Sequence, residues 1–393
     1  MRRNAWIGAA LLSAAACLPA LAPAQAQKVR GVSDTEIVLG MYTDLSGVTA
    51  NWGLNNSNAW RLKFDEVNAA GGVQGRKIKL IIEDNQYQVP RSVQAANKLL
   101  NRDNVFAMVA NAGTPMNNAT LPEQIEKNVP NIFPLTSARS MYEPLHRLKF
   151  GLGASYYDQM RAGVKHFVEQ RGKKTLCAMY QDTDFGRDVM HGVWDQTKAM
   201  NIKLAAETAH KPTDTDFSAA VAKLRDAKCD LVLLGTIVRD TNQIISAIRK
   251  IGWDVDILGQ IASYDTAVAE APGGANEGYY TMTSILFATP DDPREKVQNF
   301  VKKYKAAYNK DPNFAAQIGW SGAQVVVAAF EKAGRNLTTD SFLKGLESIK
   351  DFHDDFDSPP FTFGPDKHQG SNMSFLTQVQ KGRFVRITDP IGY

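Results

Sequence analysis

Cysteine and histidine are scarce in this sequence, with three and six residues respectively among 393. No Cys-x-x-Cys pair occurs and the histidines are scattered, so the sequence predicts no metal site, and we expect no cofactor. If residues 1–26 are removed, as argued below, Cys177 and Cys229 are the remaining cysteines. We predict two free buried thiols, because each lies in or beside a predicted strand and a disulfide requires a narrow range of Cα separations. Export of the chain would permit the alternative, a disulfide.

An excess of charge of one sign is also lacking: 45 Lys and Arg residues stand against 41 Asp and Glu residues, a formal net charge of +4 at pH 7. No Lys/Arg-rich run occurs, which argues against nucleic acid as a partner. The Gly-x-Gly-x-x-Gly and Walker patterns of nucleotide enzymes do not follow the first predicted strand, and no Gly-x-Ser-x-Gly elbow occurs. We therefore expect a protein that is not an enzyme. A nucleotide-dependent α/β enzyme is the alternative from another class.

Long apolar runs are confined to the N-terminus. Met1-Arg2-Arg3 is followed by an Ala-rich apolar segment from Ile7 to Leu21 and then by Ala24-Gln25-Ala26. A basic start, a short apolar region and an A-x-A site are typical of a secretory signal peptide, so we expect residues 1–26 to be removed after Ala26. No later segment approaches the length of a membrane span. The sequence thus predicts a mature chain that is soluble in the periplasm and long enough for two domains.

Residues 36–84 predict a strand, a polar loop, a helix and a second strand. The apolar run at 37–42 is typical of a buried strand, and Trp60 and Phe64 lie on one face of a helix, which predicts core positions. In such a unit, the loop after the first strand lies at the carboxyl edge of the sheet, where open α/β sheets bind ligands. Trp52 in this loop is therefore a candidate ligand residue. The alternative is a Trp that packs the loop onto its own helix.

The same alternation of strands and helices continues along the chain. Further strands are predicted at 78–83, 105–110, 174–180, 202–207, 230–235 and 256–260, and helices at 91–102, 116–128, 157–170, 187–199, 216–227 and 241–250. Residues 78–113 and 202–237 repeat the order strand, connector, helix, strand, which favours two similar α/β lobes with mostly parallel sheets. Helices at 293–309, 314–334 and 339–349 and strands at 374–380 and 383–388 complete the chain. Because these helices must pack on an existing layer, we expect them to return to the first lobe.

Several segments carry a family resemblance. They are DLSG followed by WG, EVNAAGGVQGRKIKL, NIFPLTSARS, YQDTDFGRDV and TDTDFSAAVAKLRDAKCDLVLLGT. In this order they resemble the type I periplasmic binding proteins, in particular the leucine/isoleucine/valine-binding group of ABC-transporter receptors. The resemblance covers nearly the whole mature chain.

The resemblance implies an α/β fold of two doubly wound, Rossmann-like lobes around a central cleft, joined by three crossovers. The crossovers would lie near 150–154, 278–284 and 356–364. Residues 27–150 with 282–358 would form the N-terminal lobe, and residues 151–281 with 359–393 the C-terminal lobe.

The resemblance also implies a function. The protein would be a periplasmic receptor, acting as a monomer, that closes on its ligand by a hinge motion. It would then deliver the ligand to the membrane permease of an ABC importer. A ligand-sensing subunit of a membrane receptor would use the same cleft.

The site that the resemblance implies is built from five loops at the cleft. Two loops of the first lobe would hold a ligand carboxylate through backbone N–H groups and hydroxyls, which are strong donors to an anion. The implied ligand residues are Trp52, Ala112, Gly113, Thr114, Leu135, Thr136, Ser137, Phe185, Thr236, Ile237 and Gln260. The rings of Trp52 and Phe185 would suit an apolar body. The structural alternatives are a core position for Phe185 and capping roles for Thr136 and Ser137.

Gln260 departs from the pattern of amino-acid binders, which carry an acidic residue near this position for the α-ammonium group of the ligand. A buried ammonium without an anion is costly to desolvate. The sequence therefore favours a small carboxylate with a hydrophobic body, an aromatic acid above all. Asp44, Asp184 or Asp265 would be substitute anions if the ligand were a branched-chain or another amino acid.

Overall fold

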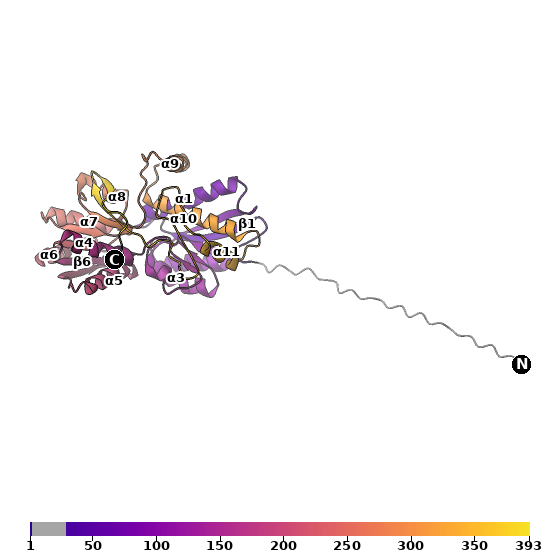
Figure 1. Cartoon of the computed structure of the whole chain (residues 1–393), viewed down its shortest axis with the longest axis horizontal. Helices are drawn as coiled ribbons and strands as arrows, with labels where there is room; N and C mark the ends of the chain where they lie inside the picture. Colours follow the sequence, from indigo (N-terminus) through magenta and orange to yellow (C-terminus); the bar gives the residue numbers. More distant parts are fainter. Residues whose placement is uncertain (2–28) are drawn as a thin grey trace.

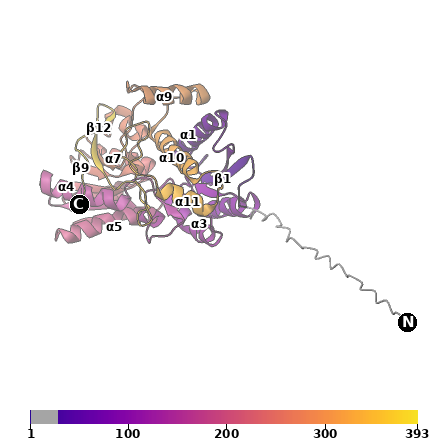
Figure 2. The same cartoon turned by 45° about the vertical axis from the view of Figure 1, so that its right-hand side comes forward.

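The computed structural model describes Met1 and residues 29–393, so the predicted signal peptide, apart from Met1, lies outside the described residues. Figure 1 shows two α/β lobes side by side, and Figure 2 shows them turned by 45°. Within the described residues, the first lobe has a five-stranded sheet ordered β2-β1-β3-β4-β5 and the second a seven-stranded sheet ordered β12-β11-β10-β9-β8-β6-β7. The predicted two-lobe fold is confirmed. In this part of the chain, no helix has the length and hydropathy needed to cross a membrane.

The first lobe alternates strands and helices, and its strands pair in parallel. Its elements are β1 (Glu36–Thr43), α1 (Ala50–Ala69), β2 (Lys77–Asp84), α2 (Val89–Asn97), the π-helical turn η1 (Lys98–Arg102), β3 (Ala107–Val109), α3 (Thr114–Glu126), β4 (Asn131–Ile132), the 3-10 turn η2 (Arg139–Met141) and β5 (Lys149–Phe150). Ile37, Leu39 and Met41 of β1 are buried, as the apolar run predicted. The parallel arrangement gathers the loops that follow these strands at one edge of the sheet.

Helix α1 begins earlier than the sequence predicted. The carboxylate of Asp44 accepts hydrogen bonds from the backbone N–H groups of Gly47 and Thr49 at 2.5 and 2.7 Å. An aspartate that bonds the following backbone turns the chain within a few residues. The helix therefore starts at Ala50, and Trp52 lies in its first turn. The sequence predicted a loop at Trp52, and this was wrong, because the turn after Asp44 is short and the helix has already begun at Ala50.

The second lobe continues the alternation of strands and helices. Its elements up to the last parallel strand are α4 (Tyr156–Arg171), β6 (Leu176–Gln181), α5 (Asp184–Ala199), β7 (Ala206–His210), α6 (Ser218–Asp226), β8 (Leu231–Gly235), α7 (Val238–Lys250), β9 (Asp256–Gly259), η3 (Ile261–Ser263), α8 (Thr266–Ala269), η4 (Pro272–Gly274) and β10 (Tyr280–Thr283). β7 is an edge strand whose pairing begins where Ala206 lies opposite Cys177, so it starts later than the predicted 202. β10 was missed, because its residues were assigned to the crossover at 278–284.

The chain then returns to the first lobe, as predicted, with α9 (Glu295–Tyr308), α10 (Phe314–Ala333) and α11 (Thr339–Glu347). α10 lies along α1 in both views (Figures 1 and 2). Glycines permit this approach, because a Cβ on Gly322 would lie 2.8 Å from Cζ2 of Trp60. The last strands, β11 (Phe375–Gln380) and β12 (Arg383–Arg386), add antiparallel to β10 in the second sheet.

The chain passes between the lobes three times: between β5 and α4, between β10 and α9, and between α11 and β11. The first and third crossovers run together, since the N–H of Gly151 donates to the carbonyl of His368 at 2.9 Å and the N–H of Gly370 donates to that of Gly151 at 3.0 Å. The residue limits of the two lobes stay a prediction.

Cys177 and Cys229 form a disulfide with a Cα separation of 5.8 Å. The prediction of two free thiols was wrong. β6 and β8 are adjacent parallel strands in which Val232 lies opposite Cys177, and Cys229 lies in the segment just before β8, close enough to Cys177 for the bridge. The sheet thus places the two residues within the separation that a disulfide spans.

Candidate ligand-binding site

A cavity of about 290 Å³ lies between the two lobes. Nine of the eleven residues predicted from the sequence line it: Trp52, Ala112, Gly113, Thr114, Leu135, Thr136, Ser137, Phe185 and Ile237. They follow β1, β3, β4, β6 and β8. The topology brings them together, because the carboxyl ends of parallel strands meet at one edge of each sheet and the two edges face each other across the cleft.

Thr236 and Gln260 do not line the cavity. Both are fully buried. The hydroxyl of Thr236 lies 2.6 Å from that of Thr241, and the amide of Gln260 donates to the Thr236 carbonyl at 3.0 Å and accepts from the N–H of Ala262 at 2.7 Å. In the structure these two side chains support the loops behind the lining.

Trp52 and Phe185 occupy matching places in the two lobes, and each is followed by a glycine. A Cβ on Gly53 would lie 1.9 Å from the carbonyl oxygen of Asp44, and one on Gly186 would lie 1.9 Å from that of Gln181. Only glycine lets the first turn of the helix approach the end of the preceding strand so closely. The aromatic residue before each glycine is thereby held at the cavity wall.

The two aromatic rings also pack on the protein itself. Trp52 meets Phe314 edge-on at a centroid distance of 6.0 Å, and Phe185 meets Tyr156 edge-on at 5.1 Å. Phe133, which sequence reasoning missed, lines the same cavity with a positive φ of 49°, an uncommon conformation for a side-chain-bearing residue. Trp52 and Phe185 therefore pack on the protein and also line the cavity, so a structural role and a contact with the ligand are compatible.

Four side chains, Tyr87, Thr114, Thr136 and Tyr156, form a hydroxyl cluster in the lining. The hydroxyls of Thr114 and Thr136 lie 2.6 Å apart. Burial raises the pKa of Tyr156, while hydrogen bonding to Thr136 and to the Ser137 backbone opposes the rise. Burial, and then the neighbouring Tyr156, raise the pKa of Tyr87. Both phenols thus stay protonated at neutral pH and can donate hydrogen bonds.

Six described α-helices have first-turn residues in the cavity lining, and four of them, α1, α3, α5 and α7, have no hydrogen-bonded side-chain cap. Ser155 and Asp265 cap the other two, α4 and α8. An uncapped start leaves backbone N–H donors and the positive end of the helix dipole to a bound group. This arrangement favours an anion.

Acidic side chains are missing from the lining of the described cavity, and Arg239 is the one charged residue there. Its guanidinium donates to the carboxylate of Asp240 at 2.6 and 2.8 Å. Asp240 is fully buried and also lies 3.2 Å from Nε2 of His210. The charge of Arg239 is therefore compensated within the protein.

The three aspartates considered as partners for an ammonium group have other contacts and do not line the cavity. Asp44 holds the turn before α1, Asp184 accepts from Asn118 at 2.8 Å, and Oδ1 of Asp265 accepts from the N–H of Ala267 at 2.9 Å, whereas the buried Oδ2 of Asp265 has no hydrogen-bond partner in the described part of the chain. Among the described residues, no group of three or more His, Cys, Asp and Glu side chains could hold a metal ion.

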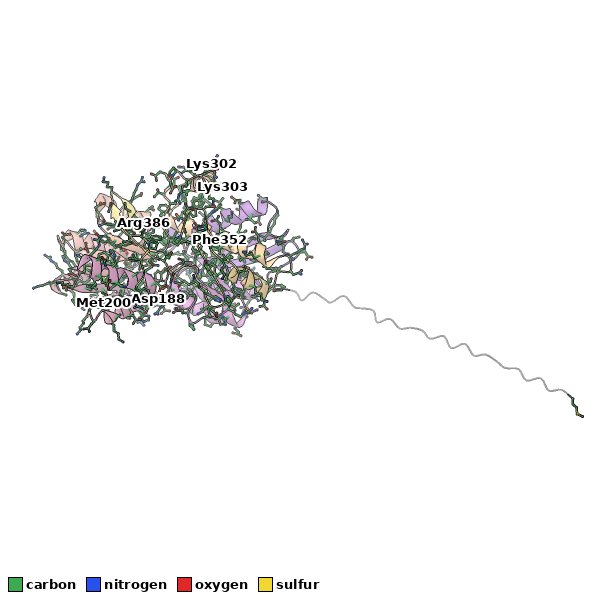
Figure 3. All side chains as sticks on the ribbon, viewed as in Figure 1. Asp188, Met200, Lys302, Lys303, Phe352 and Arg386 are labelled. Carbon is green, nitrogen blue, oxygen red and sulfur yellow. A yellow bond between two sulfur atoms is a disulfide. The ribbon has the colours of Figure 1, made fainter. Side chains whose placement is uncertain are left out.

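Polar contacts join the two lobes around the cavity. They are Asn118 with Asp184 at 2.8 Å, Asn51 with Asp265 at 3.4 Å, and the Arg139 backbone N–H with Asp188 at 3.3 Å. The Arg139 guanidinium also lies 3.7 Å from the Tyr157 ring centroid. Asp188, labelled in Figure 3, lies at this junction, where burial raises its pKa to about 6 although Arg139 opposes the rise.

Sequence reasoning missed several lining residues. Tyr87 follows β2 at the same sheet edge as the predicted loops, so the strand-end rule could have found it. Trp60 was assigned to the core and is 1% exposed, yet it also borders the cavity. Ile318 and Gly322 lie within α10, and no local signal marks them, since their place depends on how α10 packs on α1.

The fold and the cavity define a ligand-binding protein whose two lobes meet over its site. The sequence matches the periplasmic binding protein family over residues 36–383, and the chain belongs to this family. It is a type I member, related to the solute-binding proteins of ABC transporters, so the resemblance found in the sequence is confirmed.

Individual relatives are distant. The leucine-, isoleucine-, valine-, threonine-, and alanine-binding protein of Pseudomonas aeruginosa is 23% identical over 304 residues, 76% of this chain and 79% of that protein. A fatty acid ABC transporter substrate-binding protein from Thermomonospora curvata superposes with a TM-score of 0.83 at 26% identity, over 94% of this chain and 96% of that chain. An ABC transporter solute binding protein from R. palustris, in complex with benzoate, has a TM-score of 0.78 at 18% identity, over 91% and 97% of the two chains. These names point to different ligands, so the choice of ligand depends on the cavity.

Proposed function

We propose that this chain is a periplasmic receptor of an ABC importer, without catalytic activity, that captures a small carboxylate with a hydrophobic or aromatic body. One observation carries the proposal. The described cavity combines uncapped helix starts and hydroxyl donors with apolar walls, and no acidic side chain lines it.

The carboxylate would bind at the hydroxyl cluster, beside the start of α3. Of the paired hydroxyls of Thr114 and Thr136, one donates to the other, which leaves one proton to donate to the ligand. Hydrogen bonds to an ionised group are stronger than neutral ones. The dipole of α3 adds to them, so this end of the cavity can hold an anion without a countercharge.

The apolar body would lie between Trp52 of the first lobe and Phe185 of the second. A ligand that contacts both lobes stabilises the arrangement in which they meet, because it binds that arrangement more tightly than the separated one. The contacts of Asn118 and Arg139 across the junction would form in the same step. In this way binding would be coupled to closure.

An amino acid is the alternative ligand within the same class, and the name of the Pseudomonas aeruginosa relative favours it. Its ammonium group would need a nearby anion. The described lining offers hydroxyls, carbonyls, the amides of Asn51 and Asn56 and a guanidinium that is already paired, but no carboxylate. A nucleotide-dependent enzyme fits less well still, because the walls of the cavity are mainly apolar.

A thermal-shift screen of the exported protein, stripped of bound ligand, tests the proposal. The ligands are benzoate, cinnamate, aliphatic acids, leucine and adenine nucleotides. A ligand at 100 times its Kd should add about 2.7 kcal/mol to the free energy of unfolding. We expect stabilisation by the acids and little by leucine or nucleotides.

Other outcomes of the screen would contradict the proposal at different levels. Stabilisation by leucine-like amino acids alone would exclude the carboxylate preference and leave a receptor of the same family. Stabilisation by nucleotides alone would exclude the receptor function itself.

Three expectations need other experiments. N-terminal sequencing tests cleavage after Ala26, light scattering tests the monomeric state, and uptake assays test delivery to a membrane permease.

A further inference from the structure

The cavity is larger than a single-ring acid requires. Its volume is about 290 Å³, whereas a cavity of roughly 150 Å³ holds one benzene ring. A carboxylate group is much smaller than the difference, so benzoate would leave a large part of the space unfilled. Atoms that line unfilled space lose dispersion contacts, which favours a longer ligand.

The same cavity is also bordered by residues outside the five cleft loops. Trp60 lies in the middle of α1, Ile318 and Gly322 lie in α10, and Leu152 and Ile285 lie in the first and second crossovers. Apart from the indole of Trp60, these side chains are aliphatic or absent. We propose that these five residues form a tail subsite that receives an extended apolar tail of the ligand.

Gly322 lets Trp60 pack directly against α10 at the border of the tail subsite. A Cβ at this position would lie 2.8 Å from Cζ2 of Trp60. A larger residue would therefore move the indole or fill the space between α1 and α10. A hydrocarbon chain in the subsite gains free energy by leaving water in proportion to its buried area.

This inference rests on the proposed carboxylate receptor and narrows its substrate class. The ligands are monocarboxylates whose apolar part is longer than one ring, such as phenylalkanoates and medium-chain alkanoates. A second carboxylate at the far end would be buried against hydrocarbon without a partner, which is strongly unfavourable. The lining adds the polar side chains of Asn56 and Ser284 but no unpaired cation, so dicarboxylates of the same length are expected to bind more weakly.

Isothermal titration calorimetry of the stripped wild-type protein with two series of acids tests the tail subsite. The first series is benzoate, 3-phenylpropanoate and 5-phenylpentanoate, and the second is butanoate and octanoate, with octanedioate as the matched dicarboxylate. Kd is expected to fall about fourfold for each buried methylene until the cavity is full. Octanedioate is expected to bind at least about tenfold more weakly than octanoate.

The possible failures are distinguishable. If benzoate binds and neither series gains affinity with length, the tail subsite is wrong and the carboxylate receptor stands. If octanedioate binds as tightly as octanoate, the apolar character assigned to the subsite is wrong. If no acid of any length binds, the proposed function and the tail subsite both fall.

A substitution that fills the subsite gives a second test. Ile318→Trp is expected to raise the Kd for 5-phenylpentanoate and octanoate at least about tenfold, with benzoate within about twofold of wild type. Lys332→Trp, exposed near the end of the same helix, is the matched control and should leave all values unchanged. Undiminished binding of the long acids by folded Ile318→Trp protein would overturn the subsite. If that variant does not fold, the wild-type series decides alone.

Discussion

At the residue scale, Thr136 connects the parts of the proposed carboxylate site. Its hydroxyl lies 2.6 Å from that of Thr114 and accepts a hydrogen bond from the Ala138 N–H at 3.3 Å. It also contacts Tyr156 and thereby opposes the pKa rise that burial produces there. A single oxygen thus helps to orient two other hydroxyls around the start of α3.

Thr136→Val keeps the shape of the side chain and removes the hydroxyl. Because a hydrogen bond to a charged group contributes about 1.5–3 kcal/mol, we expect the Kd for a bound carboxylate to rise roughly 10- to 150-fold. Calorimetric titration measures this change. Thr213→Val, at an exposed position in the second lobe, should have no effect, and equal binding by Thr136→Val would exclude the assigned carboxylate contact.

Asp188 makes stability depend on pH. Burial raises its pKa to about 6, against an ordinary value of 3.8, so the native state holds this proton where the unfolded chain has lost it. The free energy of unfolding therefore falls as pH rises from about 4 to about 6 and is level above, a contribution of roughly 2–3 kcal/mol.

Asp188→Asn should remove this contribution. The difference in the free energy of unfolding between wild type and variant is expected to change across pH 4–6 and to be constant above pH 7, as measured by urea denaturation. Asp226→Asn, at an exposed carboxylate, is the control. A constant difference from pH 4 to pH 8 would show that Asp188 has an ordinary pKa in the folded protein.

At the scale of elements, strand order decides which residues become neighbours. Cys177 lies in β6, and Cys229 lies just before β8, 52 residues further along the chain. The strands β6 and β8 nevertheless pair directly in the second sheet. The disulfide between them therefore closes a long loop that includes α5, β7 and α6.

Replacing both cysteines by alanine should destabilise the protein. A crosslink that closes a loop of this length restricts the unfolded chain, so its loss is expected to lower the free energy of unfolding by roughly 2–4 kcal/mol. Denaturant titration of the variant measures the loss. Each single Cys→Ala variant should show a similar loss, and wild-type stability in the double variant would mean that the bridge does not form.

At the scale of the whole molecule, ligand binding and the junction between lobes are coupled. Asn118 of α3 donates to Asp184 of α5 at 2.8 Å, and its own oxygen accepts from Ser140 at 2.8 Å. Neither Asn118 nor Asp184 lines the cavity. Their contact can affect affinity only through the arrangement of the lobes.

Asn118→Ala is therefore expected to raise the Kd of the ligand about two- to tenfold, the effect of losing one hydrogen bond from the closed arrangement. The melting temperature of the ligand-free protein should change little. Asn101→Ala, at an exposed position in η1, is the matched control. Unchanged affinity in Asn118→Ala would mean that this contact does not contribute to closure.

The two-lobe α/β fold could be predicted from the sequence, because few arrangements bury the apolar faces of alternating strands and amphipathic helices. The sequence also indicated part of the cavity lining, nine of the residues that border it, since residues that follow parallel strands meet at one edge of the sheet. Trp52 was indicated by its place after the first strand, and Thr136 and Phe185 by the family resemblance.

Three other features of the protein depend on its tertiary structure. The pairing of β6 with β8 made the disulfide, and the contact of α10 with α1 placed Trp60, Ile318 and Gly322 beside the cavity. The tertiary structure also put Gln260 behind the lining, where its amide holds neighbouring loops. These features depend on which distant segments become neighbours. A local pattern of polar and apolar residues predicts which face of an element is buried, but it does not predict which other element packs on that face.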